Sequence, residues 1–237
     1  LYFTLFDTFF SRARMNCGLS SKLVGTGFAV HRSVFEHFGG WNTTTIAEDA
    51  EFAAQCAANG VRVHFVPGAL TYDEAPERFA VSLRQRRRWC SGIMDVAVCR
   101  SGALCAALRG SAPLRALDSL LVVNTPFLQT ATVLPLMLGV CSALVQGTAA
   151  AFALTALLSF AVSTLGMMAF AALLAMLGGY RDRRILRTVA GFPLFMAAWL
   201  PLQLLSLVSR TRSWQPIAHT RAVRAESLCR TRFLTQI

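Results

Sequence analysis

Three long apolar runs in the second half of the chain constrain its fold more than any other feature. Residues 117–145 carry one charged side chain, Asp118, residues 149–178 carry none, and residues 189–208 form a third uncharged run. Each run reaches the roughly 20 residues that a helix needs to cross a bilayer. Because lipid offers no hydrogen-bond partners to backbone N–H and C=O groups, we expect all three runs to be helices.

The amino-acid composition agrees with a multi-pass membrane protein. Hydrophobic residues make up 54% of the 237 residues, charged residues only 15%, and the net charge is +11. Arginines flank the apolar runs, as they do on the cytoplasmic side of membrane proteins. They do not form an aromatic-studded soluble patch, so we expect a lipid bilayer as a partner and no nucleic acid.

The distribution of arginine leaves the side of the C-terminus open. Residues 181–187 hold four arginines, which indicates a cytoplasmic loop. The first half of the chain is also expected to face the cytoplasm. Three full spans would then place the arginine-rich residues 210–230 on the other side of the membrane. Because residues 189–208 contain two prolines, this run is our candidate for a re-entrant or interfacial segment.

The seven cysteines do not form the pattern of a metal site or of a disulfide framework. Their number is odd, and no Cys-x-x-Cys pair occurs. Reduced thiols fit a first half that faces the cytoplasm.

Residues 1–92 combine helix and strand signals, from which we predict an α/β fold. Residues 61–66 alternate in polarity and are followed by a proline and a glycine, which is typical of a strand. Helix, tight turn and strand in this order favour a layered α/β domain. We expect further short strands at residues 28–30 and 69–72, and helices at residues 34–38 and 46–57.

Gln85, Arg88 and Trp89 are the strongest candidates for a binding surface. Their spacing of i, i+3 and i+4 places them on one face of a helix that we expect to begin at Pro76. Planar guanidinium groups suit phosphate oxygens, and an indole face suits a sugar ring. The same residue types also occur on a solvated basic helix with a tryptophan at the bilayer interface, so residue type alone leaves both interpretations open.

An acidic helix start and a glycine-rich turn precede this cluster. Glu48, Asp49 and Glu51 lie in the first turn of a predicted helix, where the helix dipole favours acidic side chains. A positioned carboxylate in such a place can also act as a general base. Thr26 and Gly27 belong to a Gly-Thr-Gly turn that either brings the backbone close to a ligand or simply reverses the chain.

Five short motifs occur in order along residues 16–92. They are Gly25-Thr26-Gly27, Gly39-Gly40-Trp41-Asn42, Glu48-Asp49, Asp73-Glu74-x-Pro76 and Gln85-x-x-Arg88-Trp89. With the apolar runs that follow, this order resembles the processive, membrane-embedded enzymes of glycosyltransferase family 2, which include cellulose, chitin and hyaluronan synthases. The resemblance implies the acceptor half of a nucleotide-sugar (GT-A type) glycosyltransferase domain, followed by transmembrane helices.

The resemblance also implies a role for each matching residue. Asp49 matches the general base that takes a proton from the acceptor hydroxyl, with Glu48 beside it as a supporting residue. Gln85 and Arg88 match residues near the nucleotide diphosphate, where positive charge stabilises the leaving group. The matches near the acceptor sugar are Trp89, which stacks under it, and Thr26 and Gly27.

The implied activity is that of an inverting hexosyltransferase. The enzyme would move a sugar from a nucleotide-sugar donor, a UDP-sugar by the resemblance, to a growing polysaccharide or glycolipid acceptor. It would be a multi-pass protein of the cell inner (plasma) membrane with its catalytic part in the cytoplasm. The implied divisions are residues 1–92 for the C-terminal part of the catalytic domain, 93–115 for an interfacial helix or loop, 116–209 for the transmembrane region and 210–237 for a polar basic tail.

The chain departs from the family pattern in two places that bear on catalysis. Position 47 is Ala where the family has Thr, so a hydroxyl near the base is missing. No Asp-x-Asp occurs in the chain. In the family that motif holds Mg²⁺ or Mn²⁺ on the diphosphate, so we expect the metal ligands in a donor half upstream and no catalysis by these residues alone.

Two other functions stay open. A non-processive, lipid-linked sugar transferase of the same family would share these motifs and differ in product length. A non-enzymatic membrane protein with a basic cytoplasmic helix would show no effect of replacing Asp49.

Overall fold

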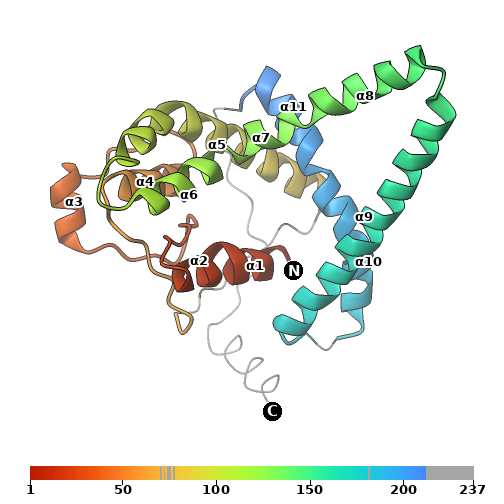
Figure 1. Cartoon of the computed structure of the whole chain (residues 1–237). Helices are drawn as coiled ribbons and strands as arrows, with labels where there is room; N and C mark the ends of the chain where they lie inside the picture. The colour runs from red at the N-terminus through yellow and green to blue at the C-terminus, as the bar shows by residue number, and fades with distance from the viewer. Residues whose placement is uncertain (70, 72, 74–75, 77, 181, 212–237) are drawn as a thin grey trace.

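The computed structural model describes residues 1–69, 71, 73, 76, 78–180 and 182–211. In this part of the chain every regular element is a helix (Figure 1). In chain order they are α1 (Tyr2–Leu5), η1 (Phe6–Ala13), α2 (Arg14–Asn16), α3 (Arg32–Phe38), α4 (Glu48–Ala58), α5 (Phe79–Ala107), α6 (Pro113–Val123), α7 (Thr125–Ala131), α8 (Val133–Val145), α9 (Ala149–Leu177), α10 (Arg184–Ala197) and α11 (Trp199–Val208).

The α/β fold predicted for the first half is wrong, because the described residues contain no strand. Residues 28–30 and 61–66 are irregular. Among the described residues no backbone hydrogen bond joins these two segments, and the one such bond to residues 61–66 from the stretch before α3 runs from the N–H of Ser21 to the C=O of Val63 at 3.0 Å. A strand needs a repeated ladder of such bonds with a neighbour, and an alternating sequence alone does not supply that neighbour. The third predicted strand, residues 69–72, lies partly outside the described residues.

The core of the first half lies where α4, α5 and α6 meet. Short side chains let the helices approach closely, so α4 packs against the middle of α5. This packing brings the acidic start of α4 next to the half of α5 that carries the arginines and Trp89. The buried members of this core are Ala47, Ala54, Ala57, Val96, Ala97, Leu104 and Val123.

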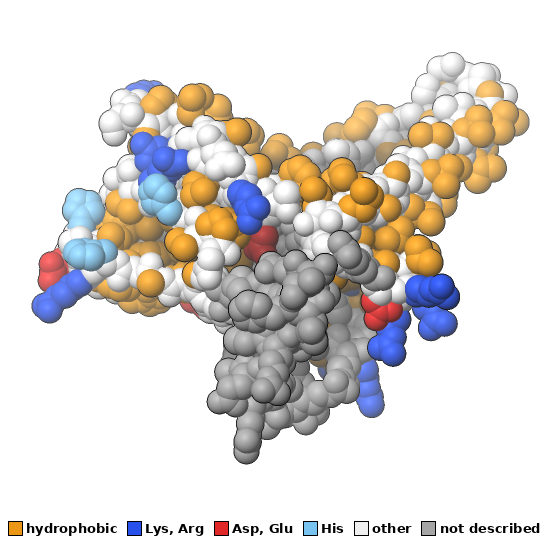
Figure 2. Space-filling model, turned by 90° about the horizontal axis from the view of Figure 1, so that it is seen from below, with side chains coloured by type: hydrophobic (Ala, Val, Ile, Leu, Met, Phe, Trp, Pro, Cys, Tyr) orange, Lys and Arg blue, Asp and Glu red, His pale blue; other side chains and the backbone are white. Residues whose placement is uncertain are grey.

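Four helical stretches among the described residues are long and apolar enough to cross a membrane. They are Phe79–Ala107, Thr125–Val145, Ala149–Leu177 and Arg184–Val208. The last three overlap the three apolar runs of the sequence, and the first is α5. In Figure 1, α8 and α9 form an arm that projects from the rest of the molecule, and hydrophobic side chains are frequent over that arm in Figure 2. Such wide apolar exposure is expected of a lipid-facing surface, and the helices indicate a multi-pass membrane protein.

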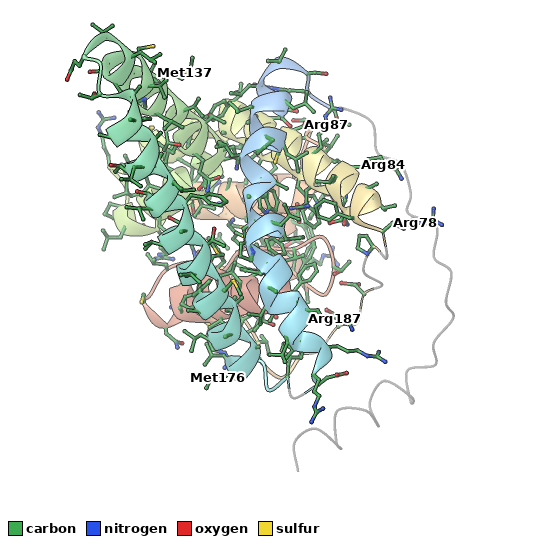
Figure 3. All side chains as sticks on the ribbon, turned by 90° about the vertical axis from the view of Figure 1, so that its right-hand side faces the viewer. Arg78, Arg84, Arg87, Met137, Met176 and Arg187 are labelled. Atoms are coloured by element: carbon green, nitrogen blue, oxygen red, sulfur yellow. The ribbon has the colours of Figure 1, made fainter. Side chains whose placement is uncertain are left out.

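Charged side chains gather at one end of this arm. Met137 of α8 and Met176 of α9 lie at opposite ends of it, and Arg187 of α10 lies at the Met176 end (Figure 3). Arg183 and Arg184 are also exposed beside Arg187. This arrangement is typical of the cytoplasmic side of a span. The division of the chain into domains stays a prediction.

Candidate active site

All the site residues predicted from the sequence line one cleft, whose volume is about 2950 Å³. The cleft extends from the N-terminal helices and α4 along α5 to α7, α9 and α11, so it joins the first half of the chain to the apolar helices. The predicted residues that line it are Thr26, Gly27, Glu48, Asp49, Gln85, Arg88 and Trp89.

Asp49 stands in the first turn of α4 with its two carboxylate oxygens in different environments. Oδ1 accepts a hydrogen bond of 2.7 Å from the N–H of Ala50. Oδ2 makes no hydrogen bond to another described residue, and it lies next to Gly25, where a Cβ would come within 3.7 Å of it. Asp49 lines the cleft, and Oδ2 is the carboxylate oxygen that has no protein donor among the described residues.

The electrostatic surroundings of Asp49 favour its protonated form. Burial raises the pKa of Asp49 above its usual value, and the nearby charge of Glu48 adds to the rise. The N–H of Ala50 and the charge of Arg88 act in the opposite direction. A carboxylate with a raised pKa is a stronger proton acceptor than an ordinary aspartate, which suits a general base.

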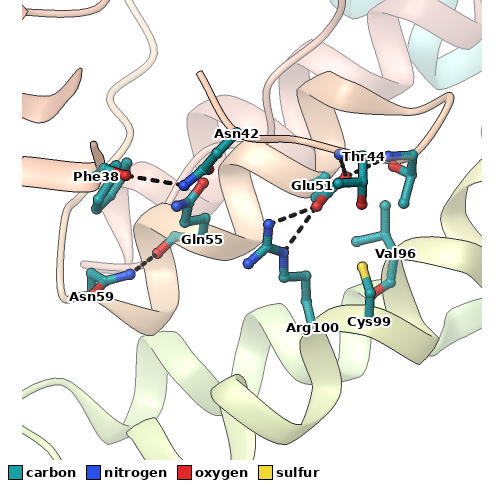
Figure 4. Close-up of polar contacts among 10 residues, drawn as sticks. Phe38, Asn42, Thr44, Glu51, Gln55, Asn59, Val96, Cys99 and Arg100 are labelled. Carbon is teal, nitrogen blue, oxygen red and sulfur yellow. Dashed lines mark hydrogen bonds and ion pairs between the residues drawn. The ribbon is translucent and has the colours of Figure 1, made fainter. Parts of the chain in front are cut away.

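Glu51, also in the first turn of α4, fixes the loop that leads into the helix (Figure 4). Its Oε2 accepts bonds from the N–H groups of Thr44 at 2.8 Å and Thr45 at 2.7 Å. Its Oε1 accepts from Arg100 of α5 at 2.6 Å, and the Glu51 side chain is only 1% exposed. Burial would raise the pKa of Glu51, but these donors outweigh it and hold the pKa below its usual value. Glu51 is thus an ionised anchor that joins the loop, α4 and α5.

Trp89 lies in an aromatic group built from three distant parts of the chain. The rings of Trp89 and Tyr2 are nearly parallel, at 14° and a centroid distance of 6.3 Å. Trp199 of α11 lies equally far from Trp89, at 16°. All three rings line the cleft, so Trp89 does not stand alone on the wall where sugar stacking is predicted.

Arg86 does not face the cleft with Arg88 but packs between α5 and the last two helices. It is 1% exposed, and its Nη1 donates to the C=O of Phe195 at 2.7 Å. Its guanidinium carbon lies 4.1 Å from the centroid of the Phe195 ring and 5.6 Å from that of Trp199, which favours stacking and cation–π attraction. Further polar contacts between α5 and the end of α11 are Arg87 with Ser209, Ser91 with Thr211 and Asp95 with Arg210.

Thr26 and Gly27 lie at the rim of the cleft. The Thr26 hydroxyl donates to Oδ2 of Asp73 at 2.8 Å, which joins two of the sequence motifs. Gly27 has φ of +68°, a conformation that favours glycine. A Cβ at Gly27 would also overlap the side chain of Thr71. The turn therefore needs glycine for its own conformation and for its close contact with Thr71.

Gly92 provides the closest approach between α4 and α5. A Cβ at Gly92 would lie 2.7 Å from the Cβ of Ala47 and 3.3 Å from its backbone nitrogen. Gly92→Ala should therefore push α5 away from the start of α4, lowering stability by about 1–3 kcal/mol, the usual cost of overpacking. Thermal unfolding in detergent measures this change.

Gly102→Ala is the matched control, because it lies in the same helix with nothing within 4 Å of an added Cβ. We expect this change to be neutral or slightly stabilising, since alanine favours a helix over glycine. Equal melting temperatures for the two variants would contradict the close approach at Gly92.

The described residues contain no group of three or more His, Cys, Asp or Glu side chains that could hold a metal ion. The Mg²⁺ or Mn²⁺ implied by the resemblance stays an expectation for the complete enzyme.

Reasoning from the sequence missed Tyr2, Trp199 and Gly92. Tyr2 and Trp199 approach Trp89 from opposite ends of the described chain, and no local sequence pattern predicts such a contact. Gly92 follows Trp89 by three residues. A glycine on that helix face was the sequence signal that could have predicted a close helix contact.

Comparison with known proteins gives one family and one curated relative. The family model described as Glycosyl transferase family group 2 matches residues 1–218. Over 72 residues the chain is 41% identical to the Probable glycosyltransferase YdaM of Bacillus subtilis (strain 168). The matched segment is 30% of this chain and 17% of that relative. No solved structure matches the chain.

Proposed function

The chain belongs to Glycosyl transferase family group 2, and from that membership we propose that it forms the acceptor side of an inverting, membrane-bound glycosyltransferase. The donor is a nucleotide-sugar, a UDP-sugar in our proposal. The acceptor is a growing polysaccharide or a glycolipid. We place the cleft at the cytoplasmic face of the inner membrane.

The observation that carries this proposal is the position of Asp49 in the same cleft as Arg88 and Trp89. In the reaction, the acceptor hydroxyl oxygen attacks the anomeric carbon while its proton passes to Oδ2 of Asp49. The bond from the anomeric carbon to the phosphate oxygen breaks, and the diphosphate leaves with the electron pair. A single displacement of this kind inverts the configuration at the anomeric carbon.

The other predicted residues bind and orient the two substrates. Arg88 and Gln85 contact the diphosphate, where the guanidinium charge stabilises the negative charge that develops on the leaving group. Trp89, with Tyr2 and Trp199, presents ring faces to the acceptor sugar. Thr26 lies at the rim of the cleft, beside the acceptor. A divalent metal bound by the complete enzyme would supply further charge on the diphosphate.

Nucleotide release from the full-length protein in membranes tests this function. A panel of UDP-sugars is supplied with Mg²⁺ or Mn²⁺, and the released UDP and the length of the product are measured. We expect release with one or two donors. Long products indicate a processive polymerase, and a single added sugar on a lipid indicates the non-processive alternative. Silence with every nucleotide-sugar and lipid-linked donor would favour the non-enzymatic alternative.

The raised pKa of Asp49 predicts the acid limb of the activity profile. The base works only when ionised, so activity falls as the pH drops through the pKa of Asp49. Because that pKa is raised, kcat/KM should fall at a pH clearly above the usual aspartate value of about 4. Arg88→Gln should move the limb to still higher pH, because the charge of Arg88 lowers the pKa of Asp49. An acid limb near pH 4 in both proteins would contradict the assignment.

A further inference from the structure

Lys22 is a cleft-lining lysine with no role in the reaction described so far. It follows α2, and its backbone N–H donates to the C=O of Phe10 at 3.3 Å. Its ammonium nitrogen lies 4.7 Å from the centroid of the Phe10 ring and 5.3 Å from that of Phe6. The two ring faces hold the charged group in place through cation–π attraction, and they offer it no hydrogen-bond acceptor.

Two neighbouring cations of the same wall, Arg14 and Arg62, already have partners. Arg14 forms an ion pair with Asp118 and donates to the C=O of Ser20. Arg62 donates to the backbone C=O groups of Leu19 and Met15. Among the described residues the ammonium of Lys22 forms no ion pair and no side-chain hydrogen bond, which distinguishes it from both arginines.

The Lys22 side chain is half-buried, and its ammonium group has three N–H donors to offer. Asp49 is the one carboxylate that favours the charged form of Lys22, while Arg14 opposes it. Asp49 cannot serve as both a permanent partner of Lys22 and a free base. The ammonium of Lys22 is therefore available to an anion that enters the cleft. The charged and titratable groups on the elements around Lys22 are Asp7 and Arg12 of η1, Arg14 of α2, Glu48 and Asp49 of α4, Arg62 and His64, Arg84, Arg87 and Arg88 of α5, and Asp118 of α6.

We propose that Lys22 binds the diphosphate oxygens of the donor, together with Arg88 of α5 and from a separate segment of the cleft wall. This assignment rests on the proposed function, because it takes the anion to be that of a nucleotide-sugar. Two cations that approach from different segments can hold both phosphates of a diphosphate at once. Lys22 acts as a compact point charge, whereas the planar fork of Arg88 fixes direction.

The ionisation of Lys22 gives this contact a pH dependence that an arginine contact lacks. Burial, and to a lesser extent the charge of Arg14, lower the pKa of Lys22 and the charge of Asp49 raises it, which together bring it to about 8. The side chain is charged below that pKa and loses its charge as the pH rises through it. A bound diphosphate stabilises the charged form, so the pKa in the complex is higher than in the free protein. Diphosphate affinity should therefore weaken above about pH 8.

Binding of UDP to the full-length protein, with Mg²⁺ present, tests the assignment without requiring turnover. Titrations between about pH 6.5 and 9.5 compare the wild type with Lys22→Met and Lys22→Arg, and uridine serves as the phosphate-free probe. We expect Lys22→Met to weaken UDP binding by about tenfold or more at pH 7, the scale of a hydrogen bond to a charged group. Uridine binding should not change. Lys22→Arg should retain UDP binding and lose the decline above pH 8, because arginine stays charged.

Two results would overturn the assignment. One is UDP affinity and pH dependence in Lys22→Met equal to those of the wild type. The other is an equal loss of uridine and UDP affinity, which would mean that Lys22 supports the base site or the fold. If the wild type transfers sugar and Lys22→Met still binds UDP normally, only the Lys22 assignment fails. If no donor releases nucleotide, the proposed function fails, and the UDP titration still decides whether Lys22 contacts a diphosphate.

Discussion

Replacing Asp49 with Asn should reduce the rate of sugar transfer at least about 100-fold, the usual scale for removing a general base. The amide has nearly the same shape as the carboxylate, so the packing at the start of α4 is retained. It cannot accept the proton of the acceptor hydroxyl, and the reaction loses its base. The loss should appear in kcat, measured as UDP release by the full-length protein in membranes.

UDP binding distinguishes loss of the base from loss of the cleft. We expect Asp49→Asn to bind UDP at least as well as the wild type, because it removes a negative charge near the diphosphate. Glu36→Gln removes the same charge from an exposed position on α3 that pairs with Arg32, and it should leave the rate unchanged. A rate in Asp49→Asn close to that of the wild type would remove Asp49 as the base.

Replacing Glu51 with Ala should have the largest effect on stability, about 3–5 kcal/mol, as for other buried ion pairs that lose one partner. The change leaves Arg100 without its carboxylate and the N–H groups of Thr44 and Thr45 without acceptors. Thermal unfolding in detergent measures the effect. Glu36→Ala breaks an exposed pair with Arg32, both of whose side chains are more than half exposed, and should cost less than about 1 kcal/mol. Similar melting temperatures for the two variants would contradict the anchoring role of Glu51.

The contribution of Glu51 also depends on pH in a defined direction. Its pKa in the folded protein is lowered, so its stabilisation is fully present above the unfolded value of about 4.3. The stabilisation is lost as the pH falls through the lowered folded pKa. Melting temperatures of the wild type and Glu51→Ala should therefore converge in acid.

Three of the four membrane-crossing candidates could be predicted from the sequence because length and apolarity are local properties, whereas α5 was not predicted as a span. The irregular backbone of residues 61–66 could not be predicted. These residues have a strand-like pattern, but the structure gives them no ladder partner. A similar limit applies to Arg86 and Arg88, which are two positions apart in the sequence. One is buried against Phe195 and the other lines the cleft. The difference depends on α10 and α11, which pack on α5 from more than a hundred positions away.

Candidate site residues were recognisable where they lie close together in the sequence, as Gln85, Arg88 and Trp89 do. Their roles stay predictions. Lys22 has no motif around it. The proposal that Lys22 binds an anion depends on its contacts with the rings of Phe6 and Phe10 and on the ion pair that occupies Arg14. These are contacts in space, which only the folded chain defines.

The aromatic group around Trp89 can form only late in the synthesis of the described chain. Tyr2, Trp89 and Trp199 come from the beginning, the middle and the end of the described chain. A ribosome therefore releases the first two rings long before the third. The three rings come together only after α11 has reached its place beside α5, so the acceptor surface that we propose is complete only once this helix has been inserted.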